Sequence, residues 1–115
     1  MRWRKLLNWP EEELWRGTIF RLLESGWPYE APVDLMLVTS EESPSGFSLI
    51  VTTGYKAGAR SWVLPSSAKA KGKVSAISRT WIVKNWERRI YAECPVTSVR
   101  IIANYPPGVQ ITAQP

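Results

Sequence analysis

The chain of 115 residues contains no histidine and only one cysteine, Cys94. Without histidine the sequence lacks the commonest general base and metal ligand in proteins. A zinc site needs several cysteine or histidine ligands and an internal disulfide needs a second cysteine, so both are excluded. No serine–lysine pair is singled out, and Pro32 separates Glu30 from Asp34, so no helix would align these two carboxylates. We therefore expect a protein that is not an enzyme and that carries no cofactor.

Long apolar runs are also absent. None approaches the roughly 18 residues that a membrane span needs, and the apolar part of MRWRKLLNWPEEE is too short for a signal peptide. A single cysteine is compatible with a reducing compartment, so we expect a soluble cytoplasmic protein with no membrane partner. Neither a repeat nor a linker divides the chain. The sequence thus predicts one domain over residues 1–115, with 104–115 as a lightly ordered tail.

The standard phosphate-binding loops are missing. The segment GYKAGAR, residues 54–60, has glycines at the spacing G-x-x-x-G, whereas a P-loop and a dinucleotide-binding loop need other spacings. What remains is a turn in which two glycines flank Tyr55, Lys56 and Ala57. Such a turn is either purely structural or displays Tyr55 and Lys56 to a partner.

Tryptophan and positive charge are abundant. The chain has seven tryptophans and a net charge of +5. Most of the tryptophans are expected in the core, but a small core seldom needs seven, and exposed tryptophans are good binding anchors. A basic chain suits an acidic protein or nucleic acid as partner.

The clearest element is a β-hairpin. The segments VDLMLVT (33–39) and FSLIVTT (47–53) are β-prone, and SEESPSG between them is rich in turn-forming residues. Before the hairpin, Pro10 and the acidic residues 11–13 predict a short helical turn. A strand at 16–23 is expected next, although a helical stripe through the same residues is an alternative.

The remaining segments complete the pattern. SWVLP (61–65) and CPVTSVRIIA (94–103) are expected to be strands, and 24–32 and 65–73 to be loops. One long helix is predicted over 76–91 with Ser75 as its N-cap.

The helix is expected to have two different faces. Its buried face comprises Ile82, Val83, Trp86 and Ile90, and its exposed aromatic and cationic face comprises Trp81, Lys84, Arg88 and Tyr91. The predicted fold is α+β, an antiparallel sheet of four to six strands with one main helix packed across one face.

The segments RGTIFRL, WPYE, VDLMLV, GYKAG with VLP, and AIS with NW occur in this order. In that order the chain resembles immunity protein family forty-five of bacterial polymorphic toxin and contact-dependent inhibition systems. The resemblance extends over roughly residues 12–103. It implies a cytoplasmic, non-enzymatic protein that neutralises the C-terminal domain of a cognate toxin by binding it.

Two functions remain open at this point. The first is this immunity function, and the second is a basic module that binds single-stranded nucleic acid, although no known nucleic-acid-binding signature is visible. Nucleic acid is therefore the less favoured partner, and the oligomeric state is left open. The candidate partner-binding residues are Trp27, Tyr29, Glu30, Tyr55, Lys56, Trp81, Lys84 and Arg88.

Overall fold

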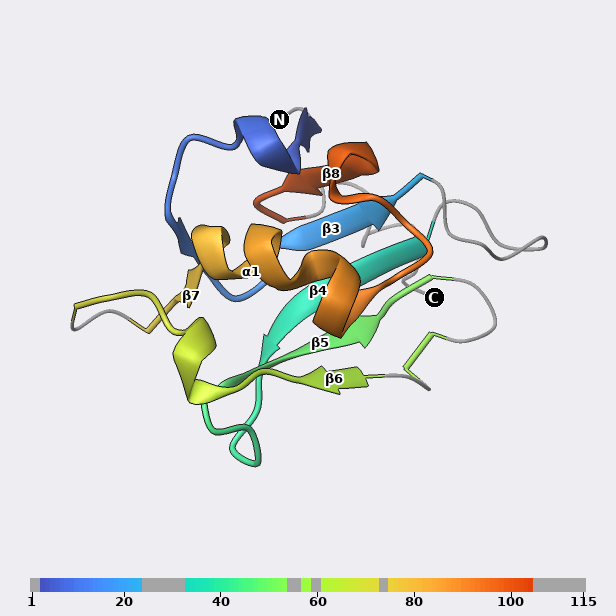
Figure 1. Ribbon diagram of the computed structural model, residues 1–115. Coiled ribbons are helices and arrows are strands. Elements are labelled where there is room, and N and C mark those ends of the chain that lie inside the picture. The colour runs from blue at the N-terminus through green and yellow to red at the C-terminus, as the bar shows by residue number, and fades with distance from the viewer. Residues whose placement is uncertain (1–2, 24–32, 54–56, 59–60, 73–74, 105–115) are drawn as a thin grey trace.

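The computed structural model describes residues 3–23, 33–53, 57–58, 61–72 and 75–104 (Figure 1). It confirms the predicted α+β class, because one helix lies across a six-stranded antiparallel sheet (Figure 1). None of the helices formed by the described residues has the length and hydrophobicity that a membrane span requires.

The main sheet has the strand order β1-β8-β3-β4-β5-β6. Its strands are β1 (Arg4–Lys5), β3 (Ile19–Leu22), β4 (Val33–Thr39), β5 (Phe47–Val51), β6 (Ser61–Val63) and β8 (Val99–Ile102). A second, two-stranded sheet pairs β2 (Glu13–Leu14) with β7 (Ile77–Ser78). The helical elements are α1 (Arg79–Asn85), the π-helical segment Trp86–Ile90 that continues it, and 3-10 turns at Leu6–Asn8, Ser66–Ala68 and Val96–Ser98.

The β4–β5 hairpin is confirmed with the predicted bounds for its first strand. Leu37 lies opposite Leu49, and these two side chains are fully buried on the face toward α1. At the end of the connection, Gly46 has a φ of 85°, a conformation that a residue with a Cβ rarely adopts. The Ser43 hydroxyl in this connection donates to the Leu64 carbonyl at 2.7 Å and so ties the hairpin end to the chain after β6.

The strand expected at 16–23 is confirmed as β3, but the helical turn expected before it is wrong. Residues Glu13 and Leu14 are instead extended and pair with β7. The extended backbone buries Leu14 completely and lets the Glu12 carbonyl accept the Arg79 N–H at 2.8 Å. Tertiary pairing therefore overrides the local helix signal.

The main helix is confirmed, but its predicted start is wrong by several residues. Ile77 and Ser78 form β7, and the helix begins at Arg79. The N-cap is Ser78 rather than Ser75, since the Ser78 hydroxyl accepts the Trp81 N–H at 3.1 Å. The chain leaves the π-helical segment where the Tyr91 N–H donates to the Trp86 carbonyl at 2.9 Å.

Burial along the helix agrees with the prediction in part. Ile82, Trp86 and Ile90 are buried as expected, whereas Val83 is only half-buried. Tyr91 was expected on the exposed face, but it is only 5% exposed. The reason is that the helix ends at Ile90. Tyr91 is the C-cap residue and has an extended backbone, so helical spacing no longer sets the direction of its side chain.

Trp86 is the largest fully buried side chain and joins the helix to the sheet. Its ring lies 5.8 Å from that of Phe20 on β3, in a tilted arrangement. Its indole Nε1–H donates to the Cys94 carbonyl at 3.1 Å, which satisfies the one polar group of the side chain.

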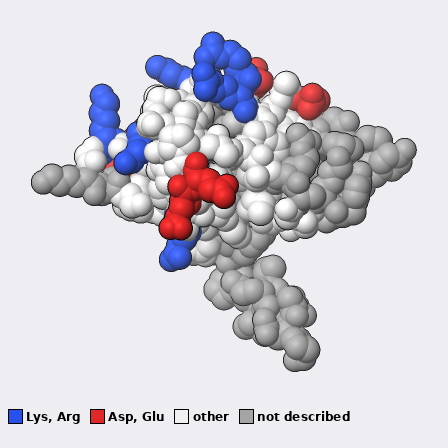
Figure 2. Space-filling model, turned by 90° about the horizontal axis from the view of Figure 1, so that it is seen from below, with Lys and Arg blue, Asp and Glu red and all other residues white. Residues whose placement is uncertain are grey.

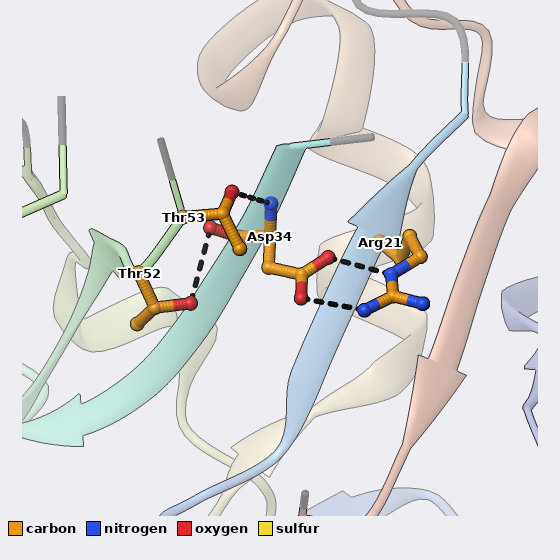
Figure 3. A network of polar contacts seen from close by, with 4 residues as sticks. All are labelled: Arg21, Asp34, Thr52 and Thr53. Carbon is orange, nitrogen blue, oxygen red and sulfur yellow. Dashed lines mark hydrogen bonds and ion pairs between the residues drawn. The ribbon is translucent and has the colours of Figure 1, made fainter. Parts of the chain in front are cut away.

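The face of the sheet away from α1 contains an ion pair whose carboxylate is buried and whose guanidinium is partly exposed. Arg21 on β3 donates from Nε and Nη2 to the two carboxylate oxygens of Asp34 on β4, at 2.8 and 3.0 Å (Figure 3). Asp34 is fully buried, and its backbone N–H donates to the Thr53 hydroxyl at 3.0 Å. The Arg21 guanidinium also lies 4.1 Å from the centre of the Trp3 ring, so the N-terminal segment is held against this face.

The strand expected at 94–103 is confirmed in its second half. β8 covers Val99–Ile102, and the 3-10 turn Val96–Ser98 precedes it. Pro95 adopts an extended conformation before this turn, which sets the direction of the segment that crosses the end of the helix. Most of the tail expected at 104–115 lies outside the described residues.

Candidate functional site

An open groove of about 480 Å³ lies beside the outer face of the helix. One wall belongs to α1 and the π-helical segment, and the other belongs to the 3-10 turn before β8. The groove is lined by Val83, Lys84, Glu87, Arg88 and Val96. It thus combines two aliphatic side chains with three charged ones.

Two hydrogen bonds hold the walls of the groove together. The Glu87 carboxylate accepts the Val96 N–H at 3.1 Å. One residue earlier on the helix, the indole N–H of Trp86 donates to the Cys94 carbonyl at 3.1 Å. The segment from Cys94 to Val96 is therefore fastened to the helix at two points, which gives the groove a defined shape.

The groove is positively charged at its helical wall. Lys84 and Arg88 are four residues apart, both are exposed, and both line the groove. Among the described residues an ion pair joins Arg21 to Asp34, and neither Lys84 nor Arg88 takes part in it. Figure 2 shows Lys and Arg side chains at several places on this face, with Asp and Glu side chains next to some of them.

The structure brings together two of the residues predicted for a binding surface, Lys84 and Arg88. It does not place Trp81 beside them as an exposed ring, since Trp81 is half-buried and packs against the core. The sequence reasoning missed Glu87 and Val96. Glu87 could have been suspected from its place between the two cations, whereas Val96 had no signal in the sequence.

The other predicted contact residues cannot be placed. Trp27, Tyr29, Glu30, Tyr55 and Lys56 all lie outside the described residues. Their role in binding stays a prediction.

Most of the described tryptophans are only partly buried, whereas most of the tryptophans were expected in the core. Trp86 is fully buried, Trp15 is 48% exposed, and the others within the described ranges are intermediate. Trp15 lines a separate shallow hollow with Arg16 and Thr39.

A further hollow, at the start of α1, has a structural explanation. The Glu12 carboxylate there accepts hydrogen bonds from the Ser78 hydroxyl, from the Thr80 hydroxyl at 2.7 Å and from the Thr80 N–H at 3.2 Å. Partial burial raises the pKa of Glu12, but the bonds from Ser78 and Thr80 and the charge of Arg79 outweigh this effect and lower the pKa below its usual value. Glu12 is thus a cap for the helix, supplied from a distant part of the chain.

The part of the chain that the structure describes contains no cluster of three or more potential metal-ligating side chains. The groove combines the exposed Lys84 and Arg88 with the half-buried Val83 and Val96.

Comparison with known proteins gives one match. The protein-family model described as Immunity protein 45 matches residues 6–101, well over half of the chain. No curated protein and no solved structure matches the sequence or the fold significantly. The matched region runs from the 3-10 turn at Leu6–Asn8 into β8, and it includes the whole groove.

Proposed function

This chain belongs to the Immunity protein 45 family, and we propose that it binds and neutralises a cognate bacterial toxin domain through direct protein–protein contact. The match over residues 6–101 is the observation that carries the proposal. We further propose that the toxin is the C-terminal domain of a polymorphic toxin and that the protein acts in the cytoplasm, by binding and without catalysis. The absence of histidine from the sequence agrees with an inhibitor that works by occupying a surface.

The groove beside the helix is the part of the surface that best suits such a contact. Interface cores combine apolar area with arginine, and the groove offers Val83 and Val96 beside Arg88. Its walls are already joined by the Glu87–Val96 hydrogen bond, so little conformational entropy is lost when a partner binds. We propose the groove as one contact region, and the turn at Tyr55 and Lys56 and the segment of Trp27, Tyr29 and Glu30 as others.

Co-expression with the toxin domain encoded beside this chain tests the proposal. The expected result is a one-to-one complex on size-exclusion chromatography and restored growth of cells that produce the toxin. If the two proteins elute separately and growth is not restored, an immunity function toward that toxin is refuted.

The same protein preparation tests the nucleic-acid alternative. Bases could stack on Trp81 beside Lys84 and Arg88, but the half-burial of Trp81 reduces the ring surface available for this. Salt-sensitive binding of oligo-thymidine, together with failure to bind the toxin domain, would favour the alternative.

A further inference from the structure

Two cations in the groove have no partner among the described residues. Arg21, in contrast, is already bound by both carboxylate oxygens of Asp34. The side chains of Lys84 and Arg88 make no hydrogen bond or ion pair with any residue in the described ranges. Their charges therefore face the groove without a counterion from that part of the chain.

The one acidic side chain of the groove does not neutralise them. The Glu87 carboxylate is engaged by the Val96 N–H at 3.1 Å, and it forms no ion pair with Lys84 or with Arg88. Its role is to hold the wall that contains Val96. Arg89, next to Arg88, is also exposed and adds further positive charge at the same end of the helix.

We propose that the groove receives an acidic segment of the toxin domain, whose carboxylates bind Arg88 and Lys84. A guanidinium matches a carboxylate with two parallel hydrogen bonds, and a lysine adds a less directional charge. The half-buried Val83 and Val96 favour a segment that also carries an aliphatic side chain. This proposal rests on the proposed immunity function, and it specifies which part of that contact is electrostatic.

The test compares two double charge reversals with equal changes of net charge. K84E/R88E alters the groove, whereas R16E/K71E alters one exposed arginine and one exposed lysine that do not line it. Binding of the toxin domain encoded beside this chain is measured by titration calorimetry at low and high NaCl, and circular dichroism confirms folding. K84E/R88E should weaken binding by about 100-fold or more, and R16E/K71E by less than about threefold. If K84E/R88E does not fold, the neutral variant K84Q/R88Q replaces it, with R16Q/K71Q as its control.

Salt and charge exchange give two further measurements. The wild-type affinity should fall as NaCl rises, and the K84E/R88E variant should lose most of this dependence. Changing the acidic residues of the toxin segment to lysine should then restore binding to K84E/R88E and not to the wild type.

The contrary outcomes are distinct. If the wild type binds the toxin and K84E/R88E binds equally well, the groove proposal is wrong while the immunity function stands. Equal weakening by both double variants would show an effect of total charge, which also refutes the groove. If the wild type does not bind, the proposed function fails and the groove proposal fails with it. Loss of oligo-thymidine binding in K84E/R88E with unchanged toxin binding would assign the groove to nucleic acid instead.

Discussion

Replacement of Trp86 by alanine tests the link between the helix and the sheet. The side chain is fully buried, its ring is 5.8 Å from that of Phe20, and its indole N–H donates to the Cys94 carbonyl at 3.1 Å. Trp86→Ala removes the ring contact and the hydrogen bond together.

The expected loss is large relative to the total stability. Emptying the site of a large aromatic side chain costs about 3–5 kcal/mol. A domain of this size has a free energy of unfolding of about 5–15 kcal/mol, so the variant should be marginally stable. Trp86→Phe keeps most of the ring contact and removes the hydrogen bond to the Cys94 carbonyl, and it should cost about 1–3 kcal/mol.

Urea denaturation followed by circular dichroism measures both variants against the wild type, with Arg88→Ala as the control on the exposed side of the same helix. Arg88→Ala should change the free energy of unfolding by less than about 0.5 kcal/mol. If Arg88→Ala destabilises the protein and Trp86→Ala does not, the assignment of the two helix faces is wrong. The groove would then lose its structural basis.

Three further predictions concern other regions. Glu12→Ala should cost about 0.5–2 kcal/mol at neutral pH, as loss of a helix cap does. Because the pKa of Glu12 in the folded protein is lowered from 4.5, the stabilisation by Glu12 is present above pH 4.5 and is lost as the pH falls through the folded pKa. The free energies of unfolding of the wild type and of Glu12→Ala, measured by urea denaturation, should therefore converge in acid. A difference that does not depend on pH would contradict this reasoning. Arg21→Met removes the guanidinium from the buried Asp34 carboxylate and should cost about 3–5 kcal/mol of stability. The double variant R21M/D34N should lose less stability than R21M and D34N lose together as single variants, and additive losses would mean that the pair is not coupled. Lys56→Glu should weaken toxin binding in calorimetry while changing stability by less than about 0.5 kcal/mol, and unchanged affinity would make that turn purely structural.

The parts of the fold that the sequence predicted correctly depend on local patterns. The β4–β5 hairpin has two β-prone segments and a turn-rich connection, and its strands pair in the expected way. The buried positions Ile82, Trp86 and Ile90 follow from helical spacing. In both cases the side-chain pattern and the final structure depend on residues close together in the sequence.

The errors occur where distant residues decide the local structure. The acidic residues near Pro10 were interpreted as the start of a helix at that point, but Glu12 caps α1, which begins at Arg79. An acidic residue stabilises a helix start equally well from elsewhere in the chain, so the sequence cannot show which helix it serves. Tyr91 was placed on the wrong face because the helix was expected to include it, whereas the helix ends at Ile90 and Tyr91 is extended.

The distance along the sequence between the two walls of the groove explains why only one wall was predicted. Lys84 and Arg88 share a helix, so their spacing places them on one face. Val96 belongs to a separate segment, which the hydrogen bond from its N–H to Glu87 helps to hold beside the helix. The wall that contains Val96 is also anchored through Trp86 and Cys94, which belong to the core. Truncation of a wall residue would therefore alter folding and binding together. Charge reversal at Lys84 and Arg88 changes only exposed side chains, and for this reason it separates the function of the groove from the stability of the fold.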